Sequence, residues 1–478
     1  MATPAPVAWR TARRAGKVLG SALAAVGSAA AVSAWIGTRV LTDAPAVRDR
    51  RPTLRARFLP ASGDDPAVVH LSGLEAELPG RWGLRVDQGY LQLDHATGIV
   101  TDHDGQWTVR PYRLLEGRVP TAADQVDRRR RRQPPPPTTR DGDAAEGAED
   151  RRATQLRGPW PVPATLTSYA WPDDPQILAG DHDASFGIEA IDSPRGYLPA
   201  WRFTPQHADE RHRRTWMITI HGRGTRRSEC FRLVHTGLEA GVTCLAISYR
   251  TDRWVRAPAA LTTLGGTEWE DVETAVRLAL REGAERIVLA GCSMGGALAA
   301  MFLRRSELGD RVAGVILDSP ALSWSPILEH VATVRRIPMR LIPVVMSIAR
   351  WRAKLDWVAL DHLDGAKDFT HPILLIHGDA DAVVPIASSD TFASVRPDLV
   401  TYVRLDGSGH VTGWNTHTHR YERAVTRFLD QVAAAPEAQA RSAARRPGRF
   451  RRVQVRTEAA RRTIVAQADR SSEPSRVD

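Results

Sequence analysis

Residues 286–295 read Arg-Ile-Val-Leu-Ala-Gly-Cys-Ser-Met-Gly, and this stretch decides the fold. The first half is an apolar run typical of a buried strand, and the second half is a Gly-x-Ser-x-Gly motif that opens a helix-like run. A serine on a sharp strand-to-helix turn needs small neighbours, because the backbone is crowded and the hydroxyl must project outward. Gly291 and Gly295 leave that space around Ser293. The motif alone also fits an ordinary glycine-rich turn, so partner motifs must decide between the two interpretations.

Three further motifs each follow a predicted strand. His221-Gly222-Arg223-Gly224 comes after the apolar run 216–220, and Asp381 lies in a His-Gly-x-x-Asp-x-x-Val-Pro segment after the run 373–376. His410 ends the sequence Gly-Ser-Gly-His after the run 400–405. Strands and helices alternate throughout this region, which predicts a mostly parallel, doubly wound sheet with helices on both faces.

This order of motifs resembles the α/β-hydrolase superfamily, over roughly Phe186 to Leu429, and the segment is similar to bacterial α/β hydrolases. The resemblance implies an α/β-hydrolase fold. About fifty residues separate the sixth and seventh strands, and in this superfamily a helical cap often occupies that position. We therefore predict a cap over about residues 321–370, with a plain helical crossover as the alternative.

The expected chemistry needs a nucleophile, a base, an acid and two N–H donors. We assign Ser293 as nucleophile, His410 as base and Asp381 as acid. Asp318, at the end of the sixth strand, is an alternative acid, whereas Asp379 is expected to form a turn. The N–H of Met294 follows the nucleophile and is the first oxyanion donor. By resemblance, the second belongs to Arg223, whose side chain, with Arg226 and Arg227, would favour an anionic substrate or lie in solvent.

These residues predict a serine hydrolase that cleaves carboxylic esters of small molecules or lipids through an acyl-enzyme, with thioesters and amides as further substrates. A peptidase resembling the prolyl-oligopeptidase or iminopeptidase groups is one alternative, but no acidic site for a peptide amine can be assigned. A membrane scaffold with a hydrolase-like fold is another. We predict neither a cofactor nor a metal, because the sequence has no Walker loop, dinucleotide fingerprint or zinc-spaced cluster.

The formal charge of +10 lies at the two ends of the chain. Residues 1–17 carry +4 and residues 434–478 carry +6, so the intervening chain has no net charge. A basic surface for nucleic acid would be expected on the folded part, and we therefore predict no nucleic-acid partner.

The N-terminal residues 1–50 form a basic leader in which the stretch 18–37 carries no charge. Its length matches a bilayer, which favours a single-pass membrane anchor. The alternative is a secretory signal peptide cleaved after Val32-Ser33-Ala34. Basic residues flank the stretch on both sides, so the positive-inside rule leaves its orientation undecided.

The remaining segments differ in composition. Residues 52–120 alternate short β-like runs with turn signals and predict a small β-rich module. Residues 121–158 have almost no large apolar side chains, and together with the basic tail 433–478 are predicted to be disordered. The hydrolase domain is expected over 159–432, and three cysteines provide no disulfide framework.

Overall fold

We analysed a computed structural model of the chain, which describes residues 34–43, 53–59, 66–73, 75–102, 105–119, 161–194, 196–208, 210–252, 255, 259 and 261–435. The predicted linker 121–158 lies outside these ranges, as do all but a few residues of the predicted tail and leader.

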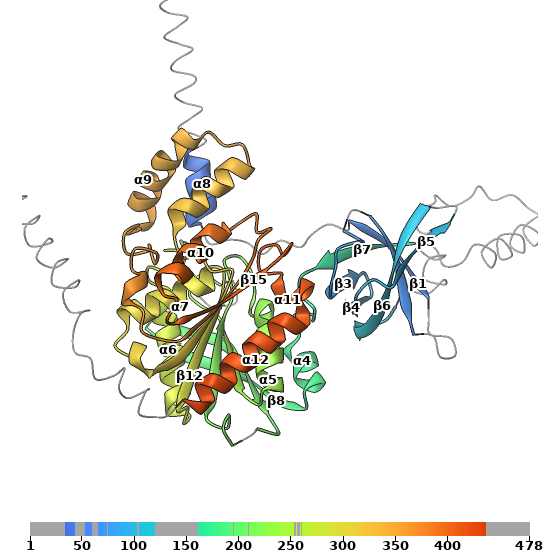
Figure 1. Cartoon of the computed structure of the whole chain (residues 1–478), viewed down its shortest axis with the longest axis horizontal. Coiled ribbons are helices and arrows are strands. Elements are labelled where there is room, and N and C mark those ends of the chain that lie inside the picture. The colour runs from blue at the N-terminus through green and yellow to red at the C-terminus, as the bar shows by residue number, and fades with distance from the viewer. Residues whose placement is uncertain are drawn as a thin grey trace, which may run out of the picture.

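An eight-stranded sheet forms the centre of the larger domain, in the order β15-β14-β13-β12-β10-β11-β9-β8 (Figure 1). The strands are β8 Ala184–Ser193, β9 Gly196–Pro205, β10 Thr215–Ile220, β11 Thr243–Ile247, β12 Arg286–Cys292, β13 Val312–Asp318, β14 Ile373–Gly378 and β15 Val400–Leu405. Strands β10 to β15 pair in parallel, whereas β9 pairs antiparallel with both β8 and β11. The carboxyl ends of the six parallel strands therefore meet at one edge, where the predicted site residues lie.

Helices cover both faces of this sheet, because the parallel strands are apolar on both sides. One face packs against α6 Trp269–Arg281, α7 Met294–Arg305 and α10 Ile386–Val395. The other packs against α4 Pro175–Asp181, α5 Phe231–Glu239, α11 Gly413–Thr416 and α12 Thr418–Ala434. Short 3₁₀ turns occur at Arg227–Cys230, Gly309–Arg311, Met339–Leu341 and Ala366–Asp368. The predicted α/β-hydrolase architecture is confirmed.

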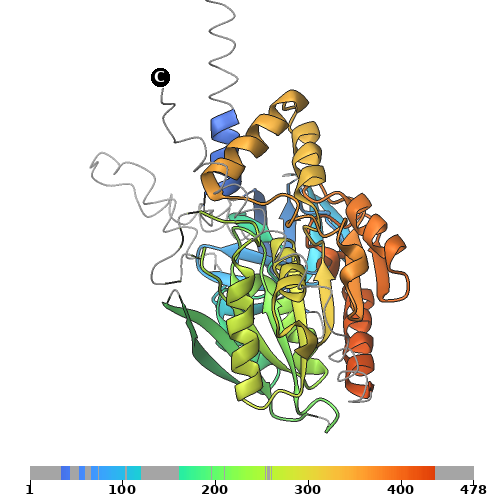
Figure 2. The same ribbon diagram turned by 90° about the vertical axis from the view of Figure 1, so that its left-hand side faces the viewer.

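The helical insertion between β13 and β14 consists of α8 Trp324–Val334 and α9 Ile342–Ala353. These two helices stand at the end of the molecule beyond the carboxyl edge of the sheet (Figures 1 and 2). Arg304 of α7 fastens the end of the insertion by donating to the carbonyls of Ala359 and Asp361. The insertion is therefore the predicted helical cap.

A separate seven-stranded sheet forms the small N-terminal module, in the order β2-β1-β7-β3-β4-β6-β5. Its strands are β1 Leu54–Leu59, β2 Val68–Ser72, β3 Trp82–Val86, β4 Gly89–Leu93, β5 Gly98–Asp102, β6 Gly105–Gly117 and β7 Val162–Thr167. A further pairing of β2 with β6 closes the sheet on itself around its own apolar core. The structure differs from the expected boundaries here, because β7 pairs with β1 and β3 and so belongs to the module rather than to the hydrolase domain.

Residues 34–42 form a helix that packs on the hydrolase domain, which the sequence did not predict. Ala34 and Thr38 are completely buried, and the Thr38 hydroxyl lies 3.3 Å from the carbonyl of Val345 in α9. A Cβ on Gly37 would lie 3.3 Å from the Val345 side chain. Residues 34–37 of the expected anchor thus belong to a helix that contacts the cap.

Among the described residues, no helix has both the length and the apolar character needed to cross a membrane. Residues 18–33 lie outside those residues. Of the predicted single-pass anchor over 18–37, the structure therefore describes only the last four residues, which belong to the helix 34–42.

Candidate active site

The turn between β12 and α7 has the geometry of a nucleophile elbow. Ser293 has φ 52° and ψ −117°, a strained conformation for a residue with a side chain. A Cβ on Gly295 would come 2.0 Å from the Ile220 carbonyl oxygen, and one on Gly291 would come 2.5 Å from the backbone of Gly295. Both positions admit only glycine, so both predicted elbow glycines lie where a close backbone approach requires them.

Backbone hydrogen bonds hold this turn in place. The Ser293 N–H donates to the Asp318 carbonyl at 2.9 Å, so the neighbouring strand β13 supports the elbow. The Ser293 carbonyl accepts from the N–H groups of Gly296 and Ala321, each at 3.0 Å. The chain that enters the cap at Ala321 is therefore fixed directly to the serine.

The three predicted catalytic side chains meet at the carboxyl edge of the sheet. The distance from Ser293 Oγ to His410 Nε2 is 3.0 Å, and that from His410 Nδ1 to Asp381 Oδ2 is 2.7 Å. With the proton on Nδ1 donated to the carboxylate, Nε2 is free to accept the serine proton. Ser293 and His410 are partly accessible, whereas Asp381 is buried.

Asp381 accepts more hydrogen bonds than His410 alone provides. The N–H groups of Val383 and Val384 both donate to its Oδ1 at 2.8 Å, and His377 Nε2 lies 3.1 Å from its Oδ2. Burial by itself would raise the pKa of this carboxyl, but the hydrogen bonds from His377, His410 and the backbone hold the pKa below its usual value. The group therefore stays ionised and orients His410 at any pH near neutrality.

The other candidates from the sequence occupy different roles. Asp318 is fully buried and bonds to the hydroxyls of Ser319 and Tyr421, so it does not pair with His410. Asp379 accepts from the Gly407 N–H at 2.6 Å and shapes the turn before the histidine, as expected. Hydrogen bonding with Cys230 and burial hold the pKa of the Cys292 thiol well above its usual value, so no thiolate competes with Ser293.

The loop after β10 lies against the serine at Gly222. A Cβ on Gly222 would lie 3.2 Å from the Ser293 Cβ, so this loop contacts the nucleophile. The Gly222 carbonyl lies 2.8 Å from His221 Nδ1 and 2.9 Å from the hydroxyls of Tyr249 and Thr225. In a trans peptide the next N–H points opposite to the carbonyl. These contacts therefore fix the direction of the Arg223 N–H.

His221 is itself held by Asp252, whose Oδ2 lies 2.9 Å from Nε2. Burial opposes the cation, but the charge and hydrogen bond of Asp252 outweigh it and raise the pKa of His221 to about 9. A protonated ring donates from both nitrogens, to Asp252 and to the Gly222 carbonyl. No motif in the sequence points to Asp252, because this residue lies thirty-one residues from its partner in an irregular segment.

The arginine side chains near this loop do not form an anion site. The Arg223 guanidinium donates to the carbonyls of Val40 and Asp43 at 2.5 and 3.0 Å, at the end of the N-terminal helix. Arg226 pairs with Asp173 at 3.1 Å, and the Arg227 guanidinium lies 4.0 Å from the centre of the Trp201 ring. The idea that these side chains favour an anionic substrate is therefore not supported.

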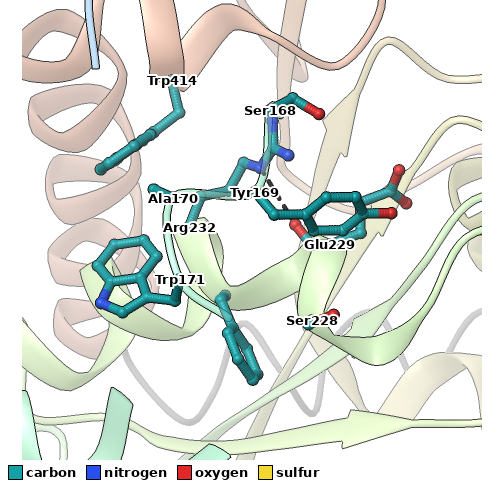
Figure 3. Close-up of a pocket in the computed structure, with 9 residues that line it drawn as sticks. Ser168, Tyr169, Ala170, Trp171, Ser228, Glu229, Arg232 and Trp414 are labelled. Atoms are coloured by element: carbon teal, nitrogen blue, oxygen red, sulfur yellow. Dashed lines mark hydrogen bonds between the residues drawn. The ribbon is translucent and has the colours of Figure 1, made fainter. Parts of the chain in front are cut away.

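A small pocket lies behind the oxyanion loop, beside α5 and α11 (Figure 3). Glu229, one of its lining residues, accepts the Gly222 N–H at 2.6 Å. Arg232, another, donates to the carbonyl of Val411, the residue after the catalytic histidine candidate. None of Ser293, Asp381 and His410 lines this pocket. Its residues support the loops on either side of the serine.

One histidine cluster within the described residues has ligand atoms close enough together for a metal: His182, His235 and Glu239. His182 Nε2 lies 2.8 Å from His235 Nδ1, and His235 Nε2 lies 3.1 Å from Glu422. Both imidazoles are thus hydrogen-bonded already. Burial and the neighbouring His235 lower the pKa of His182 to about 4, which favours its neutral form.

Comparison with known proteins finds one family whose sequence model matches the larger domain. Residues 217–425 match the sequence model of the alpha/beta hydrolase family. The elements of this segment carry the whole parallel part of the sheet and all three catalytic candidates. The match covers less than half of the chain, and together with the observed architecture it supports an α/β-hydrolase fold and a hydrolase activity for the larger domain. No curated protein sequence matches the chain.

Several solved structures of other proteins are similar to part of this chain. An esterase of Pyrococcus furiosus is 19% identical, with a TM-score of 0.42, over 53% of this chain and 93% of the esterase. Est1E of Butyrivibrio proteoclasticus is 20% identical, with a TM-score of 0.40, over 52% of this chain and 100% of Est1E. A bacterial membrane phospholipase A is 19% identical, with a TM-score of 0.39, over 55% and 90% of the two chains.

Proposed function

We propose that the protein is a serine hydrolase that cleaves carboxylic esters through an acyl-enzyme intermediate. The observation that carries the proposal is the hydrogen-bonded chain from Ser293 Oγ through His410 to Asp381, with distances of 3.0 and 2.7 Å. A serine hydroxyl needs such a base and orienting acid to become nucleophilic at neutral pH.

In the proposed reaction, His410 Nε2 takes the proton of Ser293 as Oγ bonds to the ester carbonyl carbon. The N–H groups of Arg223 and Met294 stabilise the resulting oxyanion. Collapse breaks the bond to the alcohol oxygen, which leaves with the proton from His410. Water then attacks the acyl-enzyme, with His410 as base, and releases the acid and free Ser293. An N–H donor of this kind typically contributes a hundredfold or more to the rate.

A fluorescent fluorophosphonate tests the nucleophile. We expect the full chain to be labelled and Ser293→Ala to remain unlabelled, with labelling of His410→Ala slower by at least a hundredfold. Ser394→Ala removes an exposed serine of α10 and should label like the parent. Labelling of Ser293→Ala, or an unlabelled but folded parent, would contradict the proposal.

Substrate class follows from a second measurement. A series of p-nitrophenyl esters of increasing acyl length, beside a p-nitroanilide of the same acyl group, separates esterase from amidase activity. We expect ester turnover to exceed amide turnover. Faster cleavage of peptide anilides would favour the peptidase alternative instead. The full chain is required, because residues 40 and 43 contact the oxyanion loop.

We also propose that the protein associates with a membrane through its uncharged N-terminal stretch, with secretion after cleavage near Ser33 as the alternative. The intact mass of the protein purified from its membrane or secreted fraction distinguishes the two. A cleaved product would begin at Trp35 and lack the buried Ala34.

A further inference from the structure

Large apolar side chains are exposed at the cap end of the molecule. Trp351 of α9 is 76% exposed and Val358 is 79% exposed, although side chains of this kind are usually buried. Val344 lies seven residues before Trp351, so both point to the same side of the helix. The helix 34–42 adds three more exposed apolar side chains. We call the set the cap face: Trp35, Ile36, Val40, Val344, Trp351 and Val358.

Direct contacts join the two parts of the cap face. Arg352 of α9 pairs with Asp43 at 2.6 Å, and its guanidinium lies 5.8 Å from the centre of the Trp35 ring. The Thr38 hydroxyl reaches the Val345 carbonyl on the same side of α9. Both views show helix 34–42 beside α8 and α9 at one end of the molecule (Figures 1 and 2). The apolar side chains therefore belong to one end of the fold.

The segment that carries α8 and α9 is also basic. Residues 324–358 contain six cations and only two anions, Glu329 and Asp356. Arg335, Arg336 and Arg340 lie in the exposed turn between α8 and α9. The chain between its two basic ends has no net charge, so this +4 is a local excess. Apolar side chains with a surrounding excess of arginine match the interfacial layer of an anionic bilayer.

We propose that the cap face rests on the surface of an anionic lipid bilayer. Three observations favour a bilayer over a protein partner: exposed tryptophans of a kind enriched at membrane interfaces, the local positive charge, and the connection to residues 18–33. Those sixteen uncharged residues lead directly into the helix that carries Trp35 and Ile36. We expect this uncharged stretch to contact the same lipid surface and so to hold the cap face against it.

This orientation places the catalytic edge of the sheet toward the lipid. The cap leaves the sheet at Ala321, whose N–H bonds to the Ser293 carbonyl. The oxyanion loop contacts the other part of the cap face, since the Arg223 guanidinium binds the Val40 carbonyl. An ester dissolved in the bilayer would then reach the site without crossing bulk water. The proposal itself concerns binding and does not depend on the ester chemistry.

A fluorescent probe can test the contact in the full chain. All three native cysteines are buried, so Ser347→Cys, on the exposed side of α9 between Val344 and Trp351, can be labelled with NBD. Ser185→Cys in β8, at the opposite end of the molecule, is the matched control. With vesicles of phosphatidylcholine and phosphatidylglycerol (7:3), we expect NBD emission at 347 to rise at least twofold and shift to shorter wavelength. The probe at 185 should not respond.

Two further arms test the apolar and the charged contributions. Val344→Ser with Trp351→Ser, in the labelled protein, should remove most of the response, and pure phosphatidylcholine should give a smaller one. Circular dichroism checks that the double variant remains folded. An unchanged probe at 347, an equal response at 185, or a response that persists in the double variant would overturn the proposal. If the protein bound vesicles through residues 18–33 alone, the probe at 347 would stay in water, and this outcome would also overturn the proposal.

Discussion

Four donors converge on the carboxylate of Asp381, although the catalytic geometry requires only one. The hydrogen-bonded chain from Ser293 through His410 to Asp381 does not require the side chain of His377. It is completely buried and also bonds to Ser389 at 2.7 Å, so its ring cannot turn away. We interpret His377 as a positioning residue that sets the direction of Asp381, which in turn sets the tautomer of His410.

Asp381→Asn should therefore abolish activity without unfolding the protein. The amide cannot stabilise the imidazolium and favours the wrong tautomer, so we expect fluorophosphonate labelling to slow by about a thousandfold or more. His377→Gln keeps an N–H donor near Asp381 and should slow labelling by less than about tenfold. Equal losses in the two variants would show that His377 does more than position the carboxylate.

The His221–Asp252 pair predicts a pH dependence of stability. The pKa of His221 is about 9 in the folded protein and about 6.5 in an unfolded chain. Because the folded state binds the extra proton, the contribution is complete below pH 6.5 and is lost as the pH rises through 9. Its upper limit is roughly 3 to 4 kcal/mol, at about 1.4 kcal/mol per pKa unit.

Urea unfolding at several pH values measures this contribution. The parent should be more stable than Asp252→Asn at pH 6.5, and the difference should narrow steadily toward pH 9.5. The exposed Asp192→Asn in β8 is the control and should show no such trend. A difference that stays constant with pH would mean that His221 is neutral in the folded protein.

At the scale of elements, the elbow and β10 lie so close together that the turn has no room for a side chain. Gly295→Ala would place a Cβ about 2 Å from the Ile220 carbonyl oxygen, and backbone cannot move aside as a side chain can. We expect a destabilisation of about 3 kcal/mol or more, together with loss of labelling. Thermal unfolding followed by circular dichroism measures it.

Gly180→Ala is the control for that substitution. Gly180 is exposed within α4, and a Cβ there would meet no atom within 4 Å. Alanine in a helix should leave the melting temperature unchanged or slightly higher. A similar loss of stability in both variants would show that alanine is harmful for a reason other than the crowded elbow.

Elements and site residues could be predicted from the sequence where the interactions that define them are local in the chain. Each parallel strand is a local apolar run, and Ser293, His410 and Asp381 each lie in a local motif, so their placement could be inferred from sequence. The partner of His221 and the guanidinium partners of Arg223 come from distant segments with no motif of their own. Strand β7 was missed for the same reason, because pairing across the segment 121–158 assigns it to the module.

The helix 34–42 shows most clearly where prediction from the sequence fails. Its alanine, glycine and threonine residues suit a tightly packed helix as well as a membrane segment. Ala34, Thr38, Leu41 and Thr42 do form a buried stripe with helical spacing. That spacing was visible in the sequence, but the surrounding uncharged residues pointed to the bilayer, and tertiary contact with α9 decided otherwise.

On the level of the whole molecule, Asn415 joins the module to the hydrolase domain through a pair of hydrogen bonds. The Arg81 N–H donates to the Asn415 carbonyl, and the Asn415 amide donates to the Arg81 carbonyl, both at 2.8 Å. A Cβ on Gly80 would lie 1.9 Å from the same Asn415 carbonyl oxygen. Asn415 is completely buried and belongs to α11, five residues after His410. This contact between the two domains, which we call the joint, is thus adjacent to the loop that carries His410.

Asn415→Ala should weaken this joint by about 1–3 kcal/mol, since it leaves buried carbonyls of the module without a donor. Calorimetry of the full chain should then show the module melting before the hydrolase domain, or at a larger separation than in the parent. The exposed Thr391→Ala in α10 removes a local hydroxyl contact and is the control. An unchanged calorimetric profile would show that the side chain of Asn415 does not couple the two domains.

The attachment of Arg223 to the carbonyls of Val40 and Asp43 gives proteolysis a particular meaning for this protein. Here the N-terminal helix completes the wall beside the oxyanion loop, so a cut after residue 43 would remove part of the catalytic domain itself. We expect such trimming to inactivate the hydrolase, so that cleavage at this point of the chain would switch the protein off.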